Sequence, residues 1–251
     1  MEKIIKITKL KIVLIIDPCS LIIDFVKAPI IVLEGLDACG KSTQTKLLQE
    51  NLKKKGLRVG YVRFPGYEKS PAGRRIAAYL RGEFGKMEEI DPRLVANLYA
   101  ADRLYQIDEI EELREKNDVV LFDRGVTSNL IYTPARGKGK SEIQELEKFI
   151  EKLEYEVFGF PRESLVIFLD ATAETRQQLH AAKKRLADLH EADDEYLEKV
   201  HKVALTRCEK DFRWVRLPVD RAGQLRRREE IAQEILTLVL EKLQKTKGPH
   251  K

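Results

Sequence analysis

Five short apolar segments recur along this chain, and a longer segment with helical periodicity follows each of them. The apolar segments are residues 30–33, 57–64, 118–123, 165–170 and 214–217. Short apolar runs bounded by glycine, proline or polar residues are typical of buried β-strands. The pattern therefore predicts five strands, of which the last is short.

The segments between the strands carry the apolar spacing and the end signals of helices. The predicted helices are residues 46–52, 72–81, 91–116, 141–157, 172–210 and 224–243, with a break near 189–192. Asp91-Pro92 supplies a cap and a first-turn proline, and Thr172 supplies another cap. A Ser-x-x-Gln pattern at Ser141 predicts a capping box.

Strands that alternate with helices predict a specific fold class. Such chains form right-handed βαβ units, in which a parallel sheet is covered by helices on both faces. We therefore expect an α/β fold with three α/β/α layers and a five-stranded parallel sheet. Ligands of such sheets bind beyond the carboxyl ends of the strands.

Residues 35–42 read G-L-D-A-C-G-K-S and match the phosphate-binding pattern G-x-x-x-x-G-K-[ST] between a strand and a helix. The amides of such a loop cradle an anion at a helix N-terminus. Lys41 is expected to reach the β- and γ-phosphates, and the Ser42 hydroxyl to ligate Mg²⁺. This pattern predicts a P-loop NTPase fold that binds a nucleoside triphosphate. The predicted cofactor-binding residues are Gly35, Leu36, Asp37, Ala38, Cys39, Gly40, Lys41, Ser42 and Thr43.

Other useful side chains follow strands and should meet the loop at one sheet edge. Phe64 and Asp170 end the second and fourth strands, and Asp123-Arg124 ends the third. Asp123 occupies the position of an acid that holds Mg²⁺ or its water, or it caps the next turn. Arg124 would bind a phosphate through its guanidinium fork.

Two further groups have two interpretations each. Tyr99 and Arg103 share one helix face, where they either stack on and read a nucleobase or form core and a local ion pair, for example with Glu109. Arg176 and the run Lys183-Lys184-Arg185 form either a solvated helix face or a basic lid. A lid at about 176–195 would stabilise charge and exclude water from the phosphates.

Composition narrows the choice of protein class. The 251 residues, with 43% hydrophobic and 35% charged content, suit one α/β domain. A polyphosphate site accounts for the net charge of +5, and without an aromatic-rich basic module we expect no nucleic-acid partner. Cys19, Cys39 and Cys208 are odd in number and far apart, which favours a reducing cytoplasm.

The two ends of the chain lie outside the predicted domain of residues 29–243. Residues 1–28 are too charged to span a bilayer, so we expect no membrane partner. Three interpretations of residues 1–28 remain: an extra edge strand and turn packed on the domain, a disordered extension, or a stretch from a wrongly assigned start codon. We favour an appended structural element. Residues 244–251 are expected to form a flexible tail.

With these residues assembled, the chain resembles the thymidylate kinases, the nucleoside monophosphate kinases that convert dTMP to dTDP. The resemblance covers about residues 29–243. The motifs that carry it are L-E-G-L-D before K-S-T-Q, R-F-P at 63–65, A-A-D-R at 100–103, D-R at 123–124 with Ser128, and L-D at 169–170.

The resemblance implies roles residue by residue, with ATP and Mg²⁺ as cofactors and dTMP as acceptor. Catalytic roles fall on Asp37, Lys41, Asp123, Arg124 and Arg185, the last as the lid arginine, and metal contacts on Ser42 and Asp123. Substrate contacts fall on Asp37, Phe64, Tyr99, Arg103, Arg124, Ser128 and Tyr132. Tyr99 would stack on thymine and Arg103 would read its edge. The resemblance also implies a homodimer.

The chain departs from the family pattern on the acceptor side. Gly125 stands where the family has Tyr or His, and residues 66–68 offer no arginine for the acceptor phosphate. These departures keep two alternatives open. One is a kinase for another pyrimidine monophosphate or for a nucleoside, and the other is a nucleotide-binding protein with impaired transfer.

Overall fold

A five-stranded parallel sheet forms the centre of the molecule. The computed structural model describes residues 3–7, 12–17, 20–25, 27–181, 189–190, 193–221 and 223–247. The strands run in the order β5–β6–β4–β7–β8, and all neighbouring pairs are parallel. Their bounds are β4 (Ile30–Glu34), β5 (Val59–Arg63), β6 (Val119–Asp123), β7 (Leu165–Asp170) and β8 (Trp214–Pro218). All five predicted strands are confirmed.

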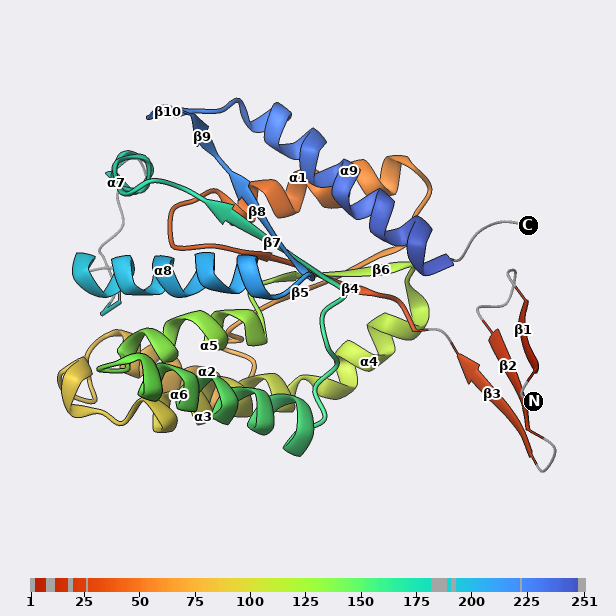
Figure 1. Cartoon of the computed structure of the whole chain (residues 1–251), viewed down its shortest axis with the longest axis horizontal. Coiled ribbons are helices and arrows are strands. Elements are labelled where there is room, and N and C mark those ends of the chain that lie inside the picture. The colour runs from red at the N-terminus through yellow and green to blue at the C-terminus, as the bar shows by residue number, and fades with distance from the viewer. Residues whose placement is uncertain are drawn as a thin grey trace.

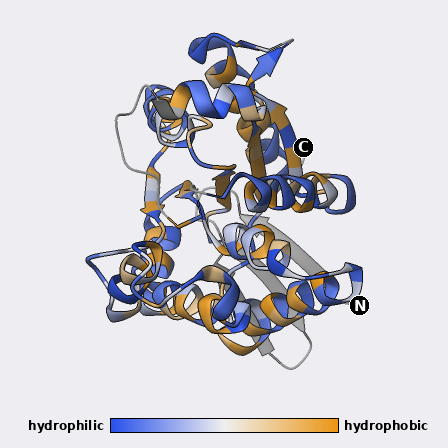
Figure 2. Ribbon diagram, turned by 90° about the vertical axis from the view of Figure 1, so that its left-hand side faces the viewer, coloured by the Kyte–Doolittle hydropathy of each residue, from blue (hydrophilic) through white to orange (hydrophobic). Residues whose placement is uncertain are grey.

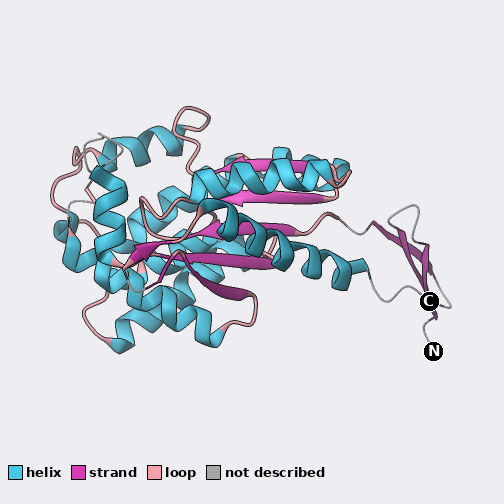
Figure 3. Cartoon of the chain, turned by 90° about the horizontal axis from the view of Figure 1, so that it is seen from above, coloured by secondary structure: helices cyan, strands magenta, loops and turns pink. Residues whose placement is uncertain are grey.

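Helices cover both faces of this sheet, as Figures 1 and 3 show. Helices α1 (Lys41–Lys54) and α9 (Arg228–Lys247) pack together on one face. The other described helices are α2 (Pro71–Leu80), α3 (Pro92–Tyr105), α4 (Ile107–Lys116), α5 (Val126–Tyr132), α6 (Lys140–Glu151), α7 (Ala173–Ala181) and α8 (Asp194–Lys210). Short helical turns lie at η1 (Met87–Glu89) and η2 (Pro134–Arg136), and a π-helix, η3 (Lys152–Val157), continues α6. The predicted three-layer α/β/α fold is confirmed.

Alternate residues of each strand enter two separate hydrophobic clusters. Ile30 and Val32 of β4 pack with α3, α5, α6 and α8, whereas Ile31 and Leu33 pack with α1 and α9. Since both faces of a parallel sheet are buried, its strands are apolar throughout. Figure 2 shows this as orange strands at the centre of the molecule.

The predicted helix over residues 91–116 is wrong as a single helix. It is divided into α3 and α4 at Gln106, whose backbone leaves the helical region at φ −100° and ψ 6°. The buried Gln106 amide turns back and donates to the Asp102 carbonyl at 3.3 Å. The two predicted N-caps are confirmed. Asp91 accepts a hydrogen bond from the Arg93 amide at 2.7 Å, and Thr172 accepts one from the Thr175 amide at 3.3 Å.

Two predicted helix boundaries are also wrong. Helix α6 begins after Gly139 without a side-chain cap, so no capping box forms at Ser141, whose hydroxyl instead faces the Glu145 carboxylate at 3.4 Å. The last helix begins at Arg228, because residues 224–225 form strand β10 (Gln224–Leu225) against β9 (Asp220–Arg221). Helix α9 also continues to Lys247, so residues 244–247 are helical, and 248–251 lie outside the described residues.

The N-terminal strands form a sheet of their own. Strands β1 (Lys3–Ile7), β2 (Ile12–Asp17) and β3 (Ser20–Phe25) pair antiparallel with one another and with no strand of the main sheet. The alternative of an extra edge strand on the main domain is therefore wrong. Among the described helices, none has both the length and the apolar character needed to cross a bilayer.

Asp170 joins the sheet to its neighbours at the carboxyl end of β7. Its buried carboxylate lies 2.6 Å from His201 Nε2 on α8 and accepts from Arg216 Nε on β8 at 2.7 Å. Burial alone would raise the pKa of Asp170, but the hydrogen bonds from His201 and Arg216 outweigh it, so the pKa is lowered. Asp170 thus has a structural position in the sheet.

We predict that Asp170→Asn lowers the free energy of unfolding at pH 7 by about 2 kcal/mol, a typical loss for a buried hydrogen bond to a charged group. Because the folded pKa is depressed, this stabilisation is present above the unfolded pKa and is lost as the pH falls through the folded pKa. Urea unfolding at several pH values measures it. Glu112→Gln, which removes an exposed helix ion pair to Lys116, is the control and should change nothing measurable. An equal loss at pH 7 and at pH 2 would contradict this account.

Candidate active site

The loop after β4 has the close-packed geometry of a phosphate cradle. Gly35 has φ +150°, and a Cβ there would lie 2.7 Å from the Leu169 carbonyl oxygen and 2.6 Å from Cys39 Sγ. Ala38 and Gly40 also have positive φ, at 64° and 93°. These turns let the loop run directly into the N-terminus of α1, where unpaired amides attract anions.

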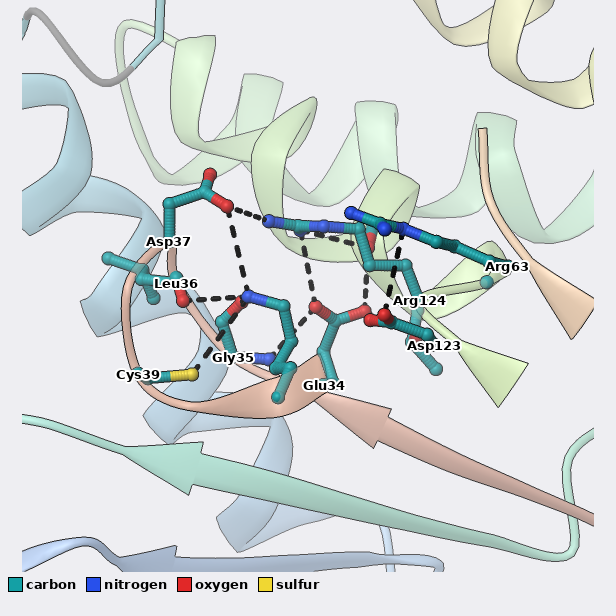
Figure 4. Close-up of polar contacts among 12 residues, drawn as sticks. Glu34, Gly35, Leu36, Asp37, Cys39, Arg63, Asp123 and Arg124 are labelled. Atoms are coloured by element: carbon teal, nitrogen blue, oxygen red, sulfur yellow. Dashed lines mark hydrogen bonds and ion pairs between the residues drawn. The ribbon is translucent and has the colours of Figure 1, made fainter. Parts of the chain in front are cut away.

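Lys41 lies folded across this loop. Its side chain is buried, and Nζ donates to the carbonyl oxygens of Gly35 at 2.7 Å and Leu36 at 2.8 Å. Asp37 Oδ1 lies 3.9 Å from the same nitrogen (Figure 4). The ammonium group is therefore held at the mouth of the loop, within reach of a phosphate bound there.

Ser42 and Asp123 meet at the start of α1 and the end of β6. The Ser42 hydroxyl donates to Asp123 Oδ2 at 3.3 Å, and Arg63 Nε lies 3.7 Å from the same oxygen. No group of three or more His, Cys, Asp or Glu side chains in the described ranges could hold a metal ion by itself. A hydroxyl and a carboxylate do suit Mg²⁺, which takes few protein ligands when phosphates and waters complete its shell.

Arg124 connects the phosphate loop to the segment after β6. With φ 67°, it places its guanidinium 2.7 Å from Asp37, 3.5 Å from Glu34 and 3.3 Å from the Ser128 hydroxyl. Its cation also lies 5.3 Å above the Tyr132 ring. Burial would lower the pKa of Arg124, but Asp37, Tyr132 and Glu34 outweigh it and hold the pKa well above its usual value. The guanidinium is thus a permanent charge.

Glu34 organises this arrangement, a role that the sequence did not predict. It is fully buried and accepts from the Gly35 amide at 2.9 Å and from the Thr127 and Ser128 hydroxyls at 2.7 Å each. The available signal for this role was a carboxylate at the end of an otherwise apolar strand, directly before the loop. Glu34 thereby ties the ends of two neighbouring strands together.

A cavity opens beside Arg124 between α3, α5 and residues 189–190. It encloses about 920 Å³, part of which is open to solvent. The predicted residues that line it are Asp37, Phe64, Tyr99, Arg103, Arg124, Ser128 and Tyr132. Its lining residues without a predicted role include Arg63, Tyr79, Asn129, Thr133, Arg136, His190 and Tyr196. Asp170 does not line it.

The α3 face takes part in both the cavity and the core, and its contact with a nucleobase stays a prediction. Tyr99 and Arg103 line the cavity, yet Arg103 also pairs in the core, with Glu154 through Nε at 2.8 Å. The suggested partner Glu109 instead pairs with Lys69 at 3.0 Å. Phe64 is buried against Phe122, edge to face at 5.4 Å, so it reaches the cavity from the core.

An aromatic group closes the far side of the cavity. His190 stacks on Tyr132 at 5.6 Å and shares a hydrogen bond with the Tyr79 hydroxyl at 2.9 Å. Burial lowers the pKa of His190 to about 4, so the ring is neutral at pH 7. The Tyr132 hydroxyl is buried in the cavity wall beside the Arg124 guanidinium.

The comparisons with known proteins agree with this geometry. The family model for thymidylate kinase matches residues 33–229. This chain belongs to the thymidylate kinase family. A thymidylate kinase of Caldanaerobacter subterraneus is 32% identical over 183 residues, which cover 71% of this chain and 80% of the relative. Human thymidylate kinase is 31% identical over 166 residues, which cover 66% of this chain and 68% of the human protein.

A solved thymidylate kinase from Candida albicans has the same fold, with a TM-score of 0.68 at 20% identity, over 87% of this chain and 94% of that one. The suspected family is therefore confirmed, and with it the assignment as an enzyme of the kinase class. The proposed lid arginine Arg185 lies outside the described residues. The side chain of Arg176 on α7 is described, and its Nη1 is buried without a hydrogen-bond partner in the described ranges.

In this family member we predict that Gly35→Ala lowers affinity for magnesium-bound ATP at least tenfold. The added Cβ meets the Leu169 carbonyl at 2.7 Å at a φ that only glycine adopts easily, so the cradle must open. Gly159→Ala is the matched control, since Gly159 also has positive φ but has open space around its Cβ position. Calorimetric titration measures both variants. Equal affinities for the two would contradict the close packing of the loop.

Proposed function

We propose that this protein transfers the γ-phosphoryl group of ATP to dTMP and releases dTDP and ADP. The observation that carries the proposal is the position of Arg124, which contacts Asp37 of the phosphate loop at 2.7 Å and also lines the cavity. One permanent cation thus lies between the phosphate loop and the cavity. Two anionic reactants that meet there would be held with their phosphates facing each other.

The cavity has the chemistry of a pyrimidine nucleotide site. Tyr99 offers an aromatic face for a base, Arg103 offers donors for a base edge, and Arg124 and Ser128 lie where the acceptor phosphate would bind. The names of the relatives point to the same acceptor, since the human and the Caldanaerobacter proteins are thymidylate kinases. These observations favour dTMP.

The ATP side has the residues for a magnesium-bound triphosphate. Lys41 would leave the loop carbonyls for the β- and γ-phosphates, and Ser42 and Asp123, 3.3 Å apart, would hold Mg²⁺ or its water. When bound, Mg²⁺ supplies charge neutralisation at the β- and γ-phosphates.

Transfer would then depend on position and charge. An oxygen of the dTMP 5′-phosphate attacks the γ-phosphorus in line, and the bond from that phosphorus to the β,γ-bridging oxygen breaks, so that ADP leaves. The attacking oxygen is already anionic near neutral pH, so no strong base is needed. Arg124 and Lys41 neutralise the charge of the transferring group. The lid residue expected to help, Arg185, retains this proposed role.

We predict that Arg124→Ala lowers kcat by about 10²–10³-fold, the usual loss for a preorganised charge at the reacting group. Arg58→Ala is the control, because Arg58 is exposed and pairs with Asp118 away from the cavity, so activity should be unchanged. An assay of ADP release with dTMP, dUMP and dCMP measures both variants and the wild type. Equal turnover of dTMP and dCMP by the wild type would contradict dTMP as the proposed acceptor.

We also propose a homodimer in the cytoplasm. On α3, Leu94, Ala101 and Tyr105 are exposed at the spacing of one helix face, whereas α6 exposes no large apolar side chain. The exposed apolar face of α3 therefore supports a two-fold contact. Both described cysteines, Cys39 and Cys208, are free thiols, which suits a reducing compartment.

We predict a light-scattering mass of about twice the 29.0 kDa of one chain. Tyr105→Glu should shift the protein toward the mass of one chain, because it buries a charge in an apolar contact. A wild-type mass of one chain at micromolar concentration would contradict the dimer.

A further inference from the structure

Glu154 is a buried carboxylate that lies behind the cavity without lining it. Its side chain is about 1% exposed, and it lies between two residues that do line the cavity, Arg103 and Asn129. Glu154 Oε2 accepts from Arg103 Nε at 2.8 Å, and Oε1 accepts from Arg103 Nη2 and from Asn129 Nδ2, the latter at 2.9 Å. A carboxylate this deeply buried persists only when its hydrogen bonds are satisfied.

The backbone brings Glu154 to this position through a change of helix type. Leu146, Ile150 and Glu154 are four residues apart and all buried, so the carboxylate continues the apolar face of α6. The chain passes into the π-helix at Lys152, which ends with Phe158 N donating to the Leu153 carbonyl at 3.0 Å. Short π-helical segments occur frequently at functional sites.

Asn129 has only one amide orientation in this environment. Its Nδ2 donates to the Ala96 carbonyl at 3.1 Å and to Glu154 at 2.9 Å, and its Oδ1 accepts from the Thr133 hydroxyl at 2.8 Å. The reversed amide would place oxygen against a carbonyl and a carboxylate. Both amide hydrogens are thus used, and what Asn129 can still offer the cavity is a lone pair of Oδ1.

Arg103 contributes the opposite kind of group. Three of its five N–H groups bond to Glu154 and the Gly125 carbonyl, which leaves two N–H donors. Burial would lower the pKa of Arg103, but the charge of Glu154 outweighs it and the pKa is raised. A guanidinium has no acceptor, so this side chain can only donate.

We infer that Glu154 is a positioning residue for base selectivity, because it holds Arg103 as donor and Asn129 as acceptor at one wall of the cavity. This pattern complements a base edge with a carbonyl beside a ring N–H, as at C4 and N3 of thymine and uracil. Cytosine presents the reverse, an amino group beside an unprotonated ring nitrogen. The inference rests on the proposed function and extends it from the acceptor to the residue that selects its base.

The energetic reason is the cost of leaving buried polar groups without hydrogen-bond partners. When a site binds its substrate through hydrogen bonds, an analogue that leaves the polar groups of the site unpaired is strongly rejected. This rejection is far stronger than that of a substrate lacking one methylene by an apolar pocket. Without a second acceptor oxygen at position 154, the Asn129 amide is released to turn. Asn129 can then present either its donor or its acceptor, and the distinction between the two edges weakens.

Glu154→Gln tests this inference, because glutamine has the same shape but one acceptor oxygen. We expect kcat/KM for dTMP to fall by about 10–100-fold. The kcat/KM for dTMP divided by that for dCMP should fall at least tenfold, and the KM for ATP should stay unchanged. Glu163→Gln is the matched control. Glu163 is also buried, accepts from the Tyr155 hydroxyl at 2.7 Å and does not line the cavity, so its substitution should leave the ratio unchanged.

The outcomes separate this inference from the proposed function. A wild type that does not prefer dTMP refutes the proposed acceptor. A wild type that prefers dTMP together with an unchanged ratio in Glu154→Gln, or an equal change in Glu163→Gln, refutes the role of Glu154. If Glu154→Gln fails to fold, Glu154→Asp replaces it, because aspartate keeps the charge but has a shorter side chain. Calorimetry with dTMP and dCMP should then show a reduced ratio of the two affinities. An unchanged ratio refutes the role of Glu154 as well.

Discussion

The geometry of the site depends on a buried carboxylate, Glu34, at the point where two neighbouring strands end. Strands β4 and β6 pair directly, so their carboxyl ends are adjacent, but the loops that leave them would be free to separate. Glu34 accepts hydrogen bonds from the first residue of one loop and from two hydroxyls after the other. The phosphate loop and the Arg124 segment therefore keep one relative position, on which transfer between two bound nucleotides would depend.

The cavity wall repeats this construction with a second buried pair. Arg124 is held by Glu34 and Asp37, and Arg103 by Glu154. Buried ion pairs add little net stability, because desolvation offsets most of the attraction. They do fix direction, since a guanidinium bonded on one side can present its remaining donors only on the other. Both pairs therefore contribute more to the orientation of charge at the cavity than to stability.

Membership of the thymidylate kinase family follows from the match over residues 33–229, and the fold follows independently from the sheet order and the phosphate loop. The departures on the acceptor side do not disturb this framework. Gly125 has an extended backbone, and a Cβ there would have no contact closer than 3.7 Å, so the backbone does not require glycine at this position. The arginines and the aromatic residues of the cavity are in place around it.

Local patterns in the sequence were sufficient for the five strands, the phosphate loop and the caps at Asp91 and Thr172, because each depends on neighbours a few residues away. They failed where a distant contact or an untypical turn decides the backbone, as in the break at Gln106 and the strand at residues 224–225. Asp170 shows the same limit, since the sequence placed it at the sheet edge beside the loop but could not predict that His201 and Arg216 engage its carboxylate.

The fold class and the anion cradle could therefore be read from the sequence, together with a minority of the cavity residues, since these follow from periodicity, from the family motifs and from the rule that parallel strands end at one edge. The pairing of the charges, in contrast, became clear only from the three-dimensional arrangement of the helices and strands. Glu154 lies 51 positions from Arg103, His190 lies 111 from Tyr79, and Glu34 lies 94 from Ser128. Such pairs form because packing the helices onto the sheet excludes water, and a buried polar group must then take whichever partner the fold brings within reach.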